Sequence, residues 1–296
     1  MTSGPSVAVS LSLPATVQSS PKRLRLASWL EGDGIEIGAL HNRLQVPPLA
    51  RVRYVDRLPV AQLREHYPEL EGLPLVDVDV IGSAENLSAL PNASADFVIA
   101  NHLLEHLEDP LAGLLEFQRV LKPRGIIYLA LPDQRLTFDR DRAVTSLDHL
   151  LKEHSGGTAE ANRWSHYLDW ALNVDKQGSD SEAHAADLMR RRYSIHFHVW
   201  RPDTFLEFFY AARRLVGLEL ELLEFAPPAT PDDIEFILIL GKATGHEVRL
   251  PPRVPGEDNP PGATEVGWRH HLLSSPLGPP ARAVRRAARR LGGRPG

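Results

Sequence analysis

Two acidic residues about 20 positions apart each lie at the end of a short apolar run. Glu36 comes two residues before Gly38 in the run 34–38, and Asp56 ends the run 51–56. A glycine lets the backbone approach a ligand closely, and an acid that ends a second strand can accept hydrogen bonds from both hydroxyls of a ribose. Only one glycine of the G-x-G-x-x-G fingerprint is present, so a nicotinamide dinucleotide fits poorly. The pattern predicts a site for an adenosine group, and Asn101, which ends the run 95–101, belongs to the same site.

Three further side chains could remove a proton from a nucleophile. Asp133 follows the expected fifth strand, and His196 and His198 alternate in the segment 193–200. With a period of two, both histidines would point to one side of an extended segment. A histidine with a pKa near ~6.5 suits proton removal at neutral pH. The histidines could equally pack at the start of the next helix, and Asp133 could cap a turn.

The segment His102-Leu103-Leu104-Glu105-His106 spells the inverted zincin pattern H-x-x-E-H. A helical pair of histidines four apart could bind zinc, with Glu105 as the base. The pattern nevertheless falls at a strand-to-helix junction, and no third ligand is identifiable. The chain has no cysteine, which excludes disulfides, thiolate nucleophiles and Cys-based zinc sites. We therefore expect no metal site.

The expected strands and helices, which must position these residues, alternate along the chain. This order predicts an α/β domain with a mostly parallel sheet and helices on both faces. The last two strands are joined by a short link, so they should be antiparallel to each other. The expected strands are 34–38, 51–56, 75–81, 95–101, 124–131, 218–225 and 234–240.

The composition divides the chain into three parts. Residues 1–21 are rich in Ser, Pro and small residues and should be disordered. Residues 22–242 should form the domain, with a helical insertion at 132–195 as a substrate lid. Its residues Trp164, Tyr167 and Trp170 could cover a pocket or pack on the core, and 139–142 is expected to be a solvated charge run. Residues 243–296 form a Pro-rich, basic tail that could touch an anionic surface.

Several of these segments resemble the motifs of class I methyltransferases that use S-adenosylmethionine, most closely those with a type 11 methyltransferase domain. Residues 36–38 resemble the family's first motif, and residues 96–110 resemble its fourth motif. Residues 119–125 resemble the turn that precedes the fifth strand in the family. The third motif corresponds to 83–87, where Ser83 replaces the usual Asp. The resemblance implies that Ser83 and Ala84 face the adenine and that Asp56 binds the ribose. It also implies a Rossmann-like, seven-stranded sheet with S-adenosylmethionine as cofactor.

The expected function is methyl transfer to an oxygen or nitrogen of a small molecule or glycan. The alternative is a non-catalytic binding protein that retains the fold. The net charge of −5 gives no global field towards nucleic acid, so no nucleic-acid partner is expected. The absence of cysteine and of a secretory signal pattern agrees with a cytoplasmic location. The sequence does not indicate an oligomeric state.

Overall fold

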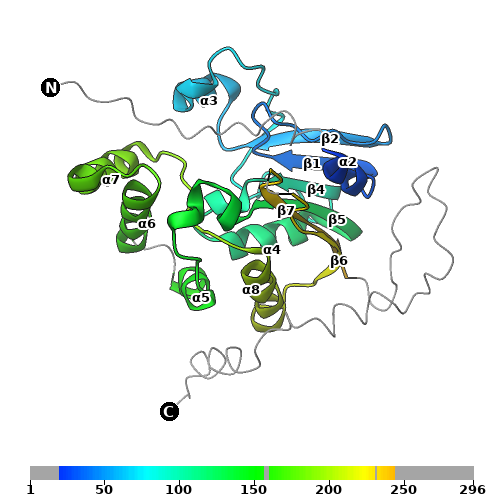
Figure 1. The fold of residues 1–296 in the computed structure, drawn as a ribbon. Coiled ribbons are helices and arrows are strands. Elements are labelled where there is room, and N and C mark those ends of the chain that lie inside the picture. Colours follow the sequence, from blue (N-terminus) through cyan, green and yellow to red (C-terminus); the bar gives the residue numbers. More distant parts are fainter. Residues whose placement is uncertain (1–19, 157–159, 231, 244–296) are drawn as a thin grey trace.

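The centre of the protein is a seven-stranded sheet with the strand order β3-β2-β1-β4-β5-β7-β6. The computed structural model describes residues 20–156, 160–230 and 232–243. Neighbouring strands from β3 to β5 are parallel, while β7 is antiparallel to both β5 and β6 (Figure 1). The predicted Rossmann-like fold with an antiparallel last pair is confirmed. The strands are β1 (Gly32–Ile37), β2 (Ala50–Asp56), β3 (Val80–Ile81), β4 (Ala95–Asn101), β5 (Leu121–Pro132), β6 (Leu220–Ala226) and β7 (Glu235–Lys242).

The third strand is much shorter than the expected range 75–81. Only Val80 and Ile81 pair with β2. The residues before them make isolated backbone bonds instead: the amide of Val76 donates to Leu40 O, and the amide of Asp79 donates to Tyr54 O. The apolar run therefore passes along the sheet edge as a loop before it joins the sheet.

Alternate residues of each central strand face opposite layers of the core. In β5, Ile127 and Leu129 pack on the layer that contains helices α4 (Pro110–Val120) and α8 (Pro202–Leu215). Ile126 and Tyr128 face the opposite layer, which contains α2 (Pro21–Ala27). Since both faces are covered by apolar side chains, β4 and β5 read as almost continuous hydrophobic runs.

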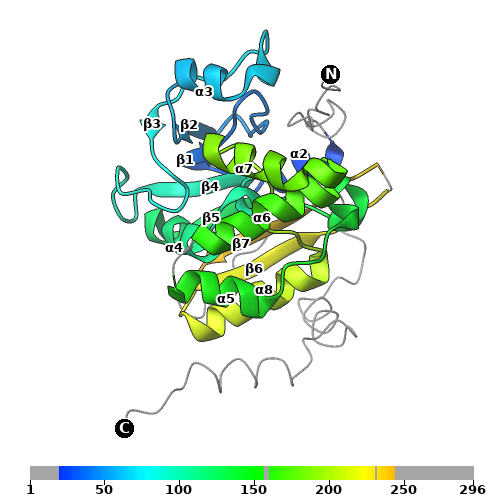
Figure 2. The same ribbon diagram turned by 90° about the vertical axis from the view of Figure 1, so that its left-hand side faces the viewer.

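A helical insertion separates β5 from α8, as the sequence predicts. It consists of short 3-10 turns followed by α5 (Leu147–Gly156), α6 (Glu160–Asn173) and α7 (Ser181–Arg191). Helices α6 and α7 enclose a small core of their own, centred on Tyr167, Trp170 and Leu188. Figure 2 shows the three helices in front of one end of the sheet. The insertion can thus contribute side chains to whatever site lies there.

Helix α4 begins where the sequence supplies the proper cap. Asp109 accepts a hydrogen bond from the amide of Ala112 at 2.9 Å, and Pro110 occupies the first helical position. The remaining short elements of the domain are α3 (Val60–His66) and the 3-10 turns Pro68–Leu70, Leu104–His106, Gln134–Leu136, Phe138–Asp141 and Gly178–Asp180.

The predicted disordered segment 1–21 and basic tail 243–296 fall almost entirely outside the described residues. Within those residues, no helix combines the length and the apolar character that crossing a membrane requires.

Candidate functional site

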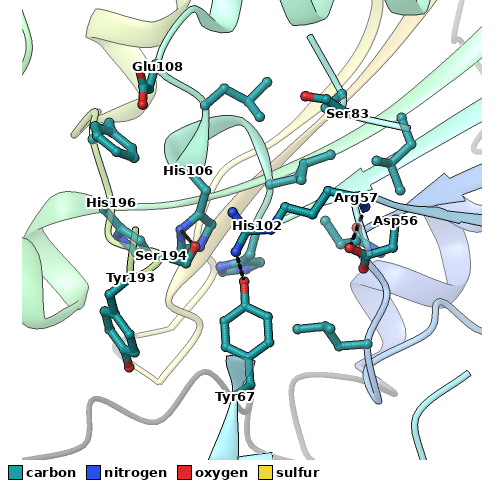
Figure 3. A pocket seen from close by; sticks show the side chains of 18 of the residues that line it. Asp56, Arg57, Tyr67, Ser83, His102, His106, Glu108, Tyr193, Ser194 and His196 are labelled. Carbon is teal, nitrogen blue, oxygen red and sulfur yellow. Dashed lines mark hydrogen bonds between the residues drawn. The ribbon is translucent and has the colours of Figure 1, made fainter. Parts of the chain in front are cut away.

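A cavity of about 470 Å³ opens at the carboxyl ends of β1, β2 and β4. One wall comes from the strand ends and the loops that follow them. The opposite wall comes from the insertion and the segment 192–197. Figure 3 shows side chains from both parts converging on the space between them. Crevices at the carboxyl ends of strands are the usual ligand sites of open α/β sheets.

Five of the six residues expected to bind the cofactor line this cavity: Gly38, Asp56, Ser83, Ala84 and Asn101. Gly38 has a φ of 68°, and a Cβ at this position would lie 3.2 Å from Leu103 Cδ1. Both the conformation and the tight contact favour glycine. The strand-end pattern thus locates one wall of the cavity.

Glu36, the sixth of these residues, does not line the cavity. It is fully buried beneath it, where its carboxylate accepts hydrogen bonds from the amide of Leu44 at 2.9 and 3.1 Å and from Asn101 Nδ2 at 3.2 Å. Burial raises the pKa of Glu36 to about 7, although these two hydrogen bonds act in the opposite direction. Glu36 therefore positions Asn101 and the loop after β1.

Two polar groups on this wall fit an adenosine-containing ligand. Asn101 Oδ1 is buried and lacks a hydrogen-bond partner among the described residues. Asp56 is 9% exposed and accepts a hydrogen bond from the amide of Arg57 at 2.7 Å through Oδ1. Burial raises the pKa of Asp56, so a hydrogen-bonding ligand would stabilise its charged form.

Arg57 and Tyr67 also line the cavity, and sequence reasoning missed both. An Nη atom of Arg57 lies 2.9 Å from the Tyr67 hydroxyl and 2.7 Å from His66 Nε2. In Figure 3 the Arg57 side chain reaches from the Asp56 side towards Tyr67. The position of Arg57, directly after the acid expected to bind the ribose, is the signal in the sequence that could have indicated it.

His196 lies in the opposite wall and is held by a buried carboxylate. Its Nδ1 is 2.6 Å from Asp139 Oδ2, and Arg142 donates to Asp139 Oδ1 at 2.8 Å. Burial would raise the pKa of Asp139, but His196 and Arg142 hold it at about 2. When Nδ1 donates to the ionised Asp139, the lone pair of a neutral imidazole at this position is on Nε2. His196 thus lines the cavity with its Nδ1 held by a carboxylate.

The prediction that all four residues of the charge run 139–142 are exposed to solvent is wrong for two of them. Asp139 and Arg142 are buried, and only Arg140 and Asp141 are exposed. The difference arises because these four residues form and follow a 3-10 turn, where positions three apart lie on one side. The acid–base spacing of Asp139 and Arg142 was the available signal.

The other two candidate bases lie away from the cavity lining. Asp133 is buried, caps the turn that follows β5 by accepting from the amide of Arg135 at 3.0 Å, and pairs with the Arg135 guanidinium. His198 is fully buried, with Nε2 3.2 Å from Glu108 O. The segment 193–200 is not a strand, so the expected period of two does not bring His196 and His198 to the same environment.

His106 is a second histidine of the cavity wall. Its Nδ1 lies 2.9 Å from Ile195 O, a contact in which the nitrogen must donate, and its ring packs edge-on against His196 with centroids 4.7 Å apart. Burial, followed by the proximity of His196, lowers the pKa of His106 well below its ordinary value. His106 is therefore neutral at physiological pH.

The residues of the H-x-x-E-H pattern do not converge on one point. His102 has a φ of 46°, which interrupts any helix there, and its Nε2 contacts Glu235 Oε2 at 2.8 Å. Glu105 lies 3.6 Å from His102 Nδ1 through Oε1, but it groups with His106 and His196, and His102 is not part of that group. The zincin geometry is absent because the two histidines belong to different local structures.

The insertion side of the cavity also presents aromatic side chains. Phe138, Tyr167 and Tyr193 line it. Trp164 and Trp170 do not; both pack in the small core of α6 and α7, and Trp170 Nε1 lies 3.1 Å from Asp175 Oδ2. Of the three aromatic residues singled out in the sequence, only Tyr167 lines the cavity.

Comparisons with known proteins agree with the geometry. Residues 32–129 match the family described as a methyltransferase domain. An uncharacterized 37.1 kDa protein of a Streptomyces fradiae transposon is 34% identical over 111 residues, a match that covers 36% of this chain and 30% of that protein. The chain thus matches less than a third of the length of that relative.

Several solved structures have a similar fold at low sequence identity. A SAM-dependent methyltransferase of Thermotoga maritima is 18% identical, covers 75% of this chain and 91% of its own, and gives a TM-score of 0.37. One of Methanosarcina mazei is 18% identical, with coverages of 73% and 96% and a TM-score of 0.39. An arsenic(III) S-adenosylmethionine methyltransferase of Chlamydomonas reinhardtii is 18% identical, with coverages of 78% and 66% and a TM-score of 0.35.

Proposed function

Residues 32–129 match a methyltransferase-domain family, and from this match we propose that the chain is a class I, S-adenosylmethionine-dependent methyltransferase. Its acceptor is an oxygen or nitrogen of a small molecule or glycan. The observation that carries the proposal is the contact between His196 and Asp139 in the cavity wall opposite the predicted cofactor residues. A histidine oriented by a carboxylate is suited to remove a proton from a hydroxyl or an amine.

The wall at the strand ends would hold the cofactor. Asp56 would accept hydrogen bonds from the ribose hydroxyls, and Gly38 would let the backbone approach the ligand. Ser83 and Ala84 lie further along the same wall, where the adenine would pack. When bound, S-adenosylmethionine supplies an electrophilic methyl group. The unpartnered Asn101 Oδ1 is available to accept a hydrogen bond from the ligand.

His196 and Asp139 would act on the acceptor. Asp139 holds the Nδ1–H of His196, so Nε2 is free to take the proton of the acceptor nucleophile as it is methylated. The imidazolium that forms is stabilised by the ionised carboxylate at 2.6 Å. Arg142 keeps Asp139 in place from the other side. The chain thereby supplies orientation and proton removal, which are what this reaction needs from a protein.

The insertion would cover the acceptor and set the specificity of the enzyme, as expected of a lid. Phe138 packs against both His196 and Trp170, with centroids 4.8 and 5.5 Å apart. Together with Tyr167 and Tyr193 it gives the acceptor half an aromatic wall with polar edges. Such a wall fits the faces of a phenol or a sugar ring.

Calorimetric titration of the full chain tests the cofactor half. We expect saturable binding of S-adenosylmethionine and of its demethylated product. Incubation with panels of sugars, aminosugars and phenols, followed by mass spectrometry of the products, then tests methyl transfer. Products that carry one added methyl and disappear with His196→Gln support the proposal. Cofactor binding without product on any of these acceptor classes would instead favour a binding protein that retains the fold.

A further inference from the structure

A second cluster of chemically competent side chains lies behind the cavity, outside the site described above. We call it the histidine cluster, and it consists of His149, Glu153, His166 and His198. His149 and Glu153 are four residues apart on α5 and so lie on one face of that helix. His166 comes from α6, and His198 from the segment that precedes α8. Three separate elements thus bring four polar groups together, two from α5 and one from each of the others.

The ligand-type atoms of the histidine cluster are close together. The Nε2 atoms of His149 and His166 are 3.2 Å apart, and they lie 3.2 and 2.9 Å from Glu153 Oε1. His198 Nε2 lies 3.5 Å from the other carboxylate oxygen, Glu153 Oε2, and 3.2 Å from Glu108 O. Zinc bonds of about 2.0–2.2 Å in a tetrahedron separate the ligand atoms by roughly 3.4 Å. The three spacings among His149 Nε2, His166 Nε2 and Glu153 Oε1 are slightly shorter than the edges of such a tetrahedron.

Hydrogen bonds alone account poorly for this arrangement. If both Nε2 atoms of His149 and His166 carried a proton, both protons would point at the same carboxylate oxygen from positions only 3.2 Å apart. Meanwhile Glu153 Oε2 is buried without a hydrogen-bond partner among the described residues. Buried polar atoms without partners are costly and need a reason. A cation between the four side chains would remove the crowding of protons and neutralise the carboxylate.

We propose that His149, Glu153, His166 and His198 bind a divalent transition-metal ion, most suitably Zn²⁺. Imidazole nitrogens with one carboxylate are a ligand set that suits zinc. Three of the four side chains are buried and His149 is half-buried, which leaves one edge through which an ion can enter. Four protein ligands fill a tetrahedral site, so the metal would have a structural role and not a catalytic one.

Such a metal would fasten the insertion to the catalytic segment. His198 is two residues from His196, and the other three ligands lie on α5 and α6. Ligation would therefore fix the distance between the lid helices and the proposed base. Metal–ligand bonds would also hold α5, α6 and the segment before α8 together at a point where their buried side chains are polar.

Metal binding by the full chain tests this inference directly. The purified protein is stripped with a chelator and titrated with Co²⁺, whose visible absorption reports tetrahedral coordination, and the Co²⁺ is then displaced by Zn²⁺. We expect one metal per chain. Loss of a hydrogen-bond partner of a metal ligand costs about 10–100-fold in metal affinity, so loss of a ligand should cost at least about a hundredfold.

The variants are Glu153→Gln and His149→Ala. Glu153→Gln keeps the shape of the side chain, and His149→Ala changes a half-buried position on a helix, where alanine is well tolerated. The matched control is His154→Ala, because His154 lies beside Glu153 on α5 but pairs with Asp109. Circular dichroism verifies that each variant is folded.

Both cluster variants should lose the metal, and His154→Ala should keep it. Chelation should lower the Tm of the wild type and of His154→Ala but not that of Glu153→Gln. The proposal fails if the wild type binds no stoichiometric Zn²⁺ or Co²⁺, or if both folded cluster variants bind the metal as the wild type does. It fails as well if His106→Ala abolishes binding while the cluster variants retain it, because the metal would then belong to Glu105, His106 and His196 in the cavity.

Discussion

His196 and Asp139 are 57 residues apart in the chain, yet Nδ1 of the histidine lies 2.6 Å from Oδ2 of the aspartate. Asp139 belongs to the first turns of the insertion, and His196 belongs to the segment that leaves it. The two ends of the insertion thus meet at the cavity, and both side chains are buried there. This contact orients the imidazole, and it is the basis of the catalytic proposal.

Replacing His196 by glutamine should lower kcat by about 10²–10⁴-fold, the usual contribution of a general base. The affinity for S-adenosylmethionine, measured by calorimetry, should stay close to that of the wild type because His196 lies on the opposite wall. His106→Gln is the comparison, since His106 packs against His196. A greater loss of kcat in His106→Gln than in His196→Gln would show that His196 is not the base.

Replacing Asp139 by asparagine should reduce stability as well as kcat. The change leaves the buried Arg142 without its ionic partner on that side, and breaking a buried pair costs about 3–5 kcal/mol. Because the pKa of Asp139 is lowered to about 2 in the folded state, its stabilising effect is present above its ordinary pKa and is lost as the pH falls through about 2.

Acid unfolding, followed by circular dichroism, measures this effect. The wild type should lose its advantage over Asp139→Asn as the pH falls below the ordinary range of an aspartate. Asp141→Asn is the matched control from the same turn, because Asp141 is exposed and pairs with Lys176 on the surface. Equal stabilities of the two variants at neutral pH would contradict the prediction.

Replacing Asp56 by alanine should weaken binding of S-adenosylmethionine at least about tenfold. In the proposed complex the change removes two charge-assisted hydrogen bonds to the ribose, each worth about 1.5–3 kcal/mol. Calorimetry provides the measurement, and Asp77→Ala, an exposed acid between β2 and β3, provides the control. Unchanged affinity in Asp56→Ala would mean that the cofactor lies elsewhere.

Glu36 should make stability depend on pH in the opposite sense from Asp139. Its folded pKa of about 7 exceeds its ordinary value, so its stabilising effect is complete below pH ~4.5 and is lost as the pH rises through about 7. Glu36→Gln can still accept from the amide of Leu44 but cannot ionise. Urea unfolding between pH 5 and 8 should show the wild type losing on the order of 3 kcal/mol relative to Glu36→Gln. A difference that is constant over this range would show that Glu36 is ionised throughout.

Replacing Phe138 by alanine should raise KM for the acceptor while cofactor affinity stays unchanged. The side chain packs on His196 and lines the insertion side of the cavity, and it makes no contribution to the strand-end wall. Leu172→Ala is a suitable control, since Leu172 is an exposed apolar residue of α6. If Phe138→Ala weakens cofactor and acceptor equally, the division of the cavity into two halves is incorrect.

The sequence by itself determined the sheet and one wall of the cavity. Apolar runs that end at Gly38, Asp56 and Asn101 specify where strands stop, and parallel strands bring their carboxyl ends to the same edge. These features are local, because a period of two and the residue after a strand can be read within a few positions. Glu36 was expected in the cavity wall on the same local grounds, but the loop after β1 covers it. Its buried carboxylate accepts hydrogen bonds from the amide of Leu44 and from Asn101.

Only the tertiary structure decided the other wall. Asp139 meets His196, and His149 and Glu153 meet His166 and His198, because α5, α6 and the segment before α8 pack together in one particular way. Helical periodicity tells which residues share a face of one helix, but it does not tell which face of another element that face will meet. The same packing separates His198 from His196. It also buries Asp139 and Arg142, whose spacing indicates a possible pair but does not tell whether that pair is covered.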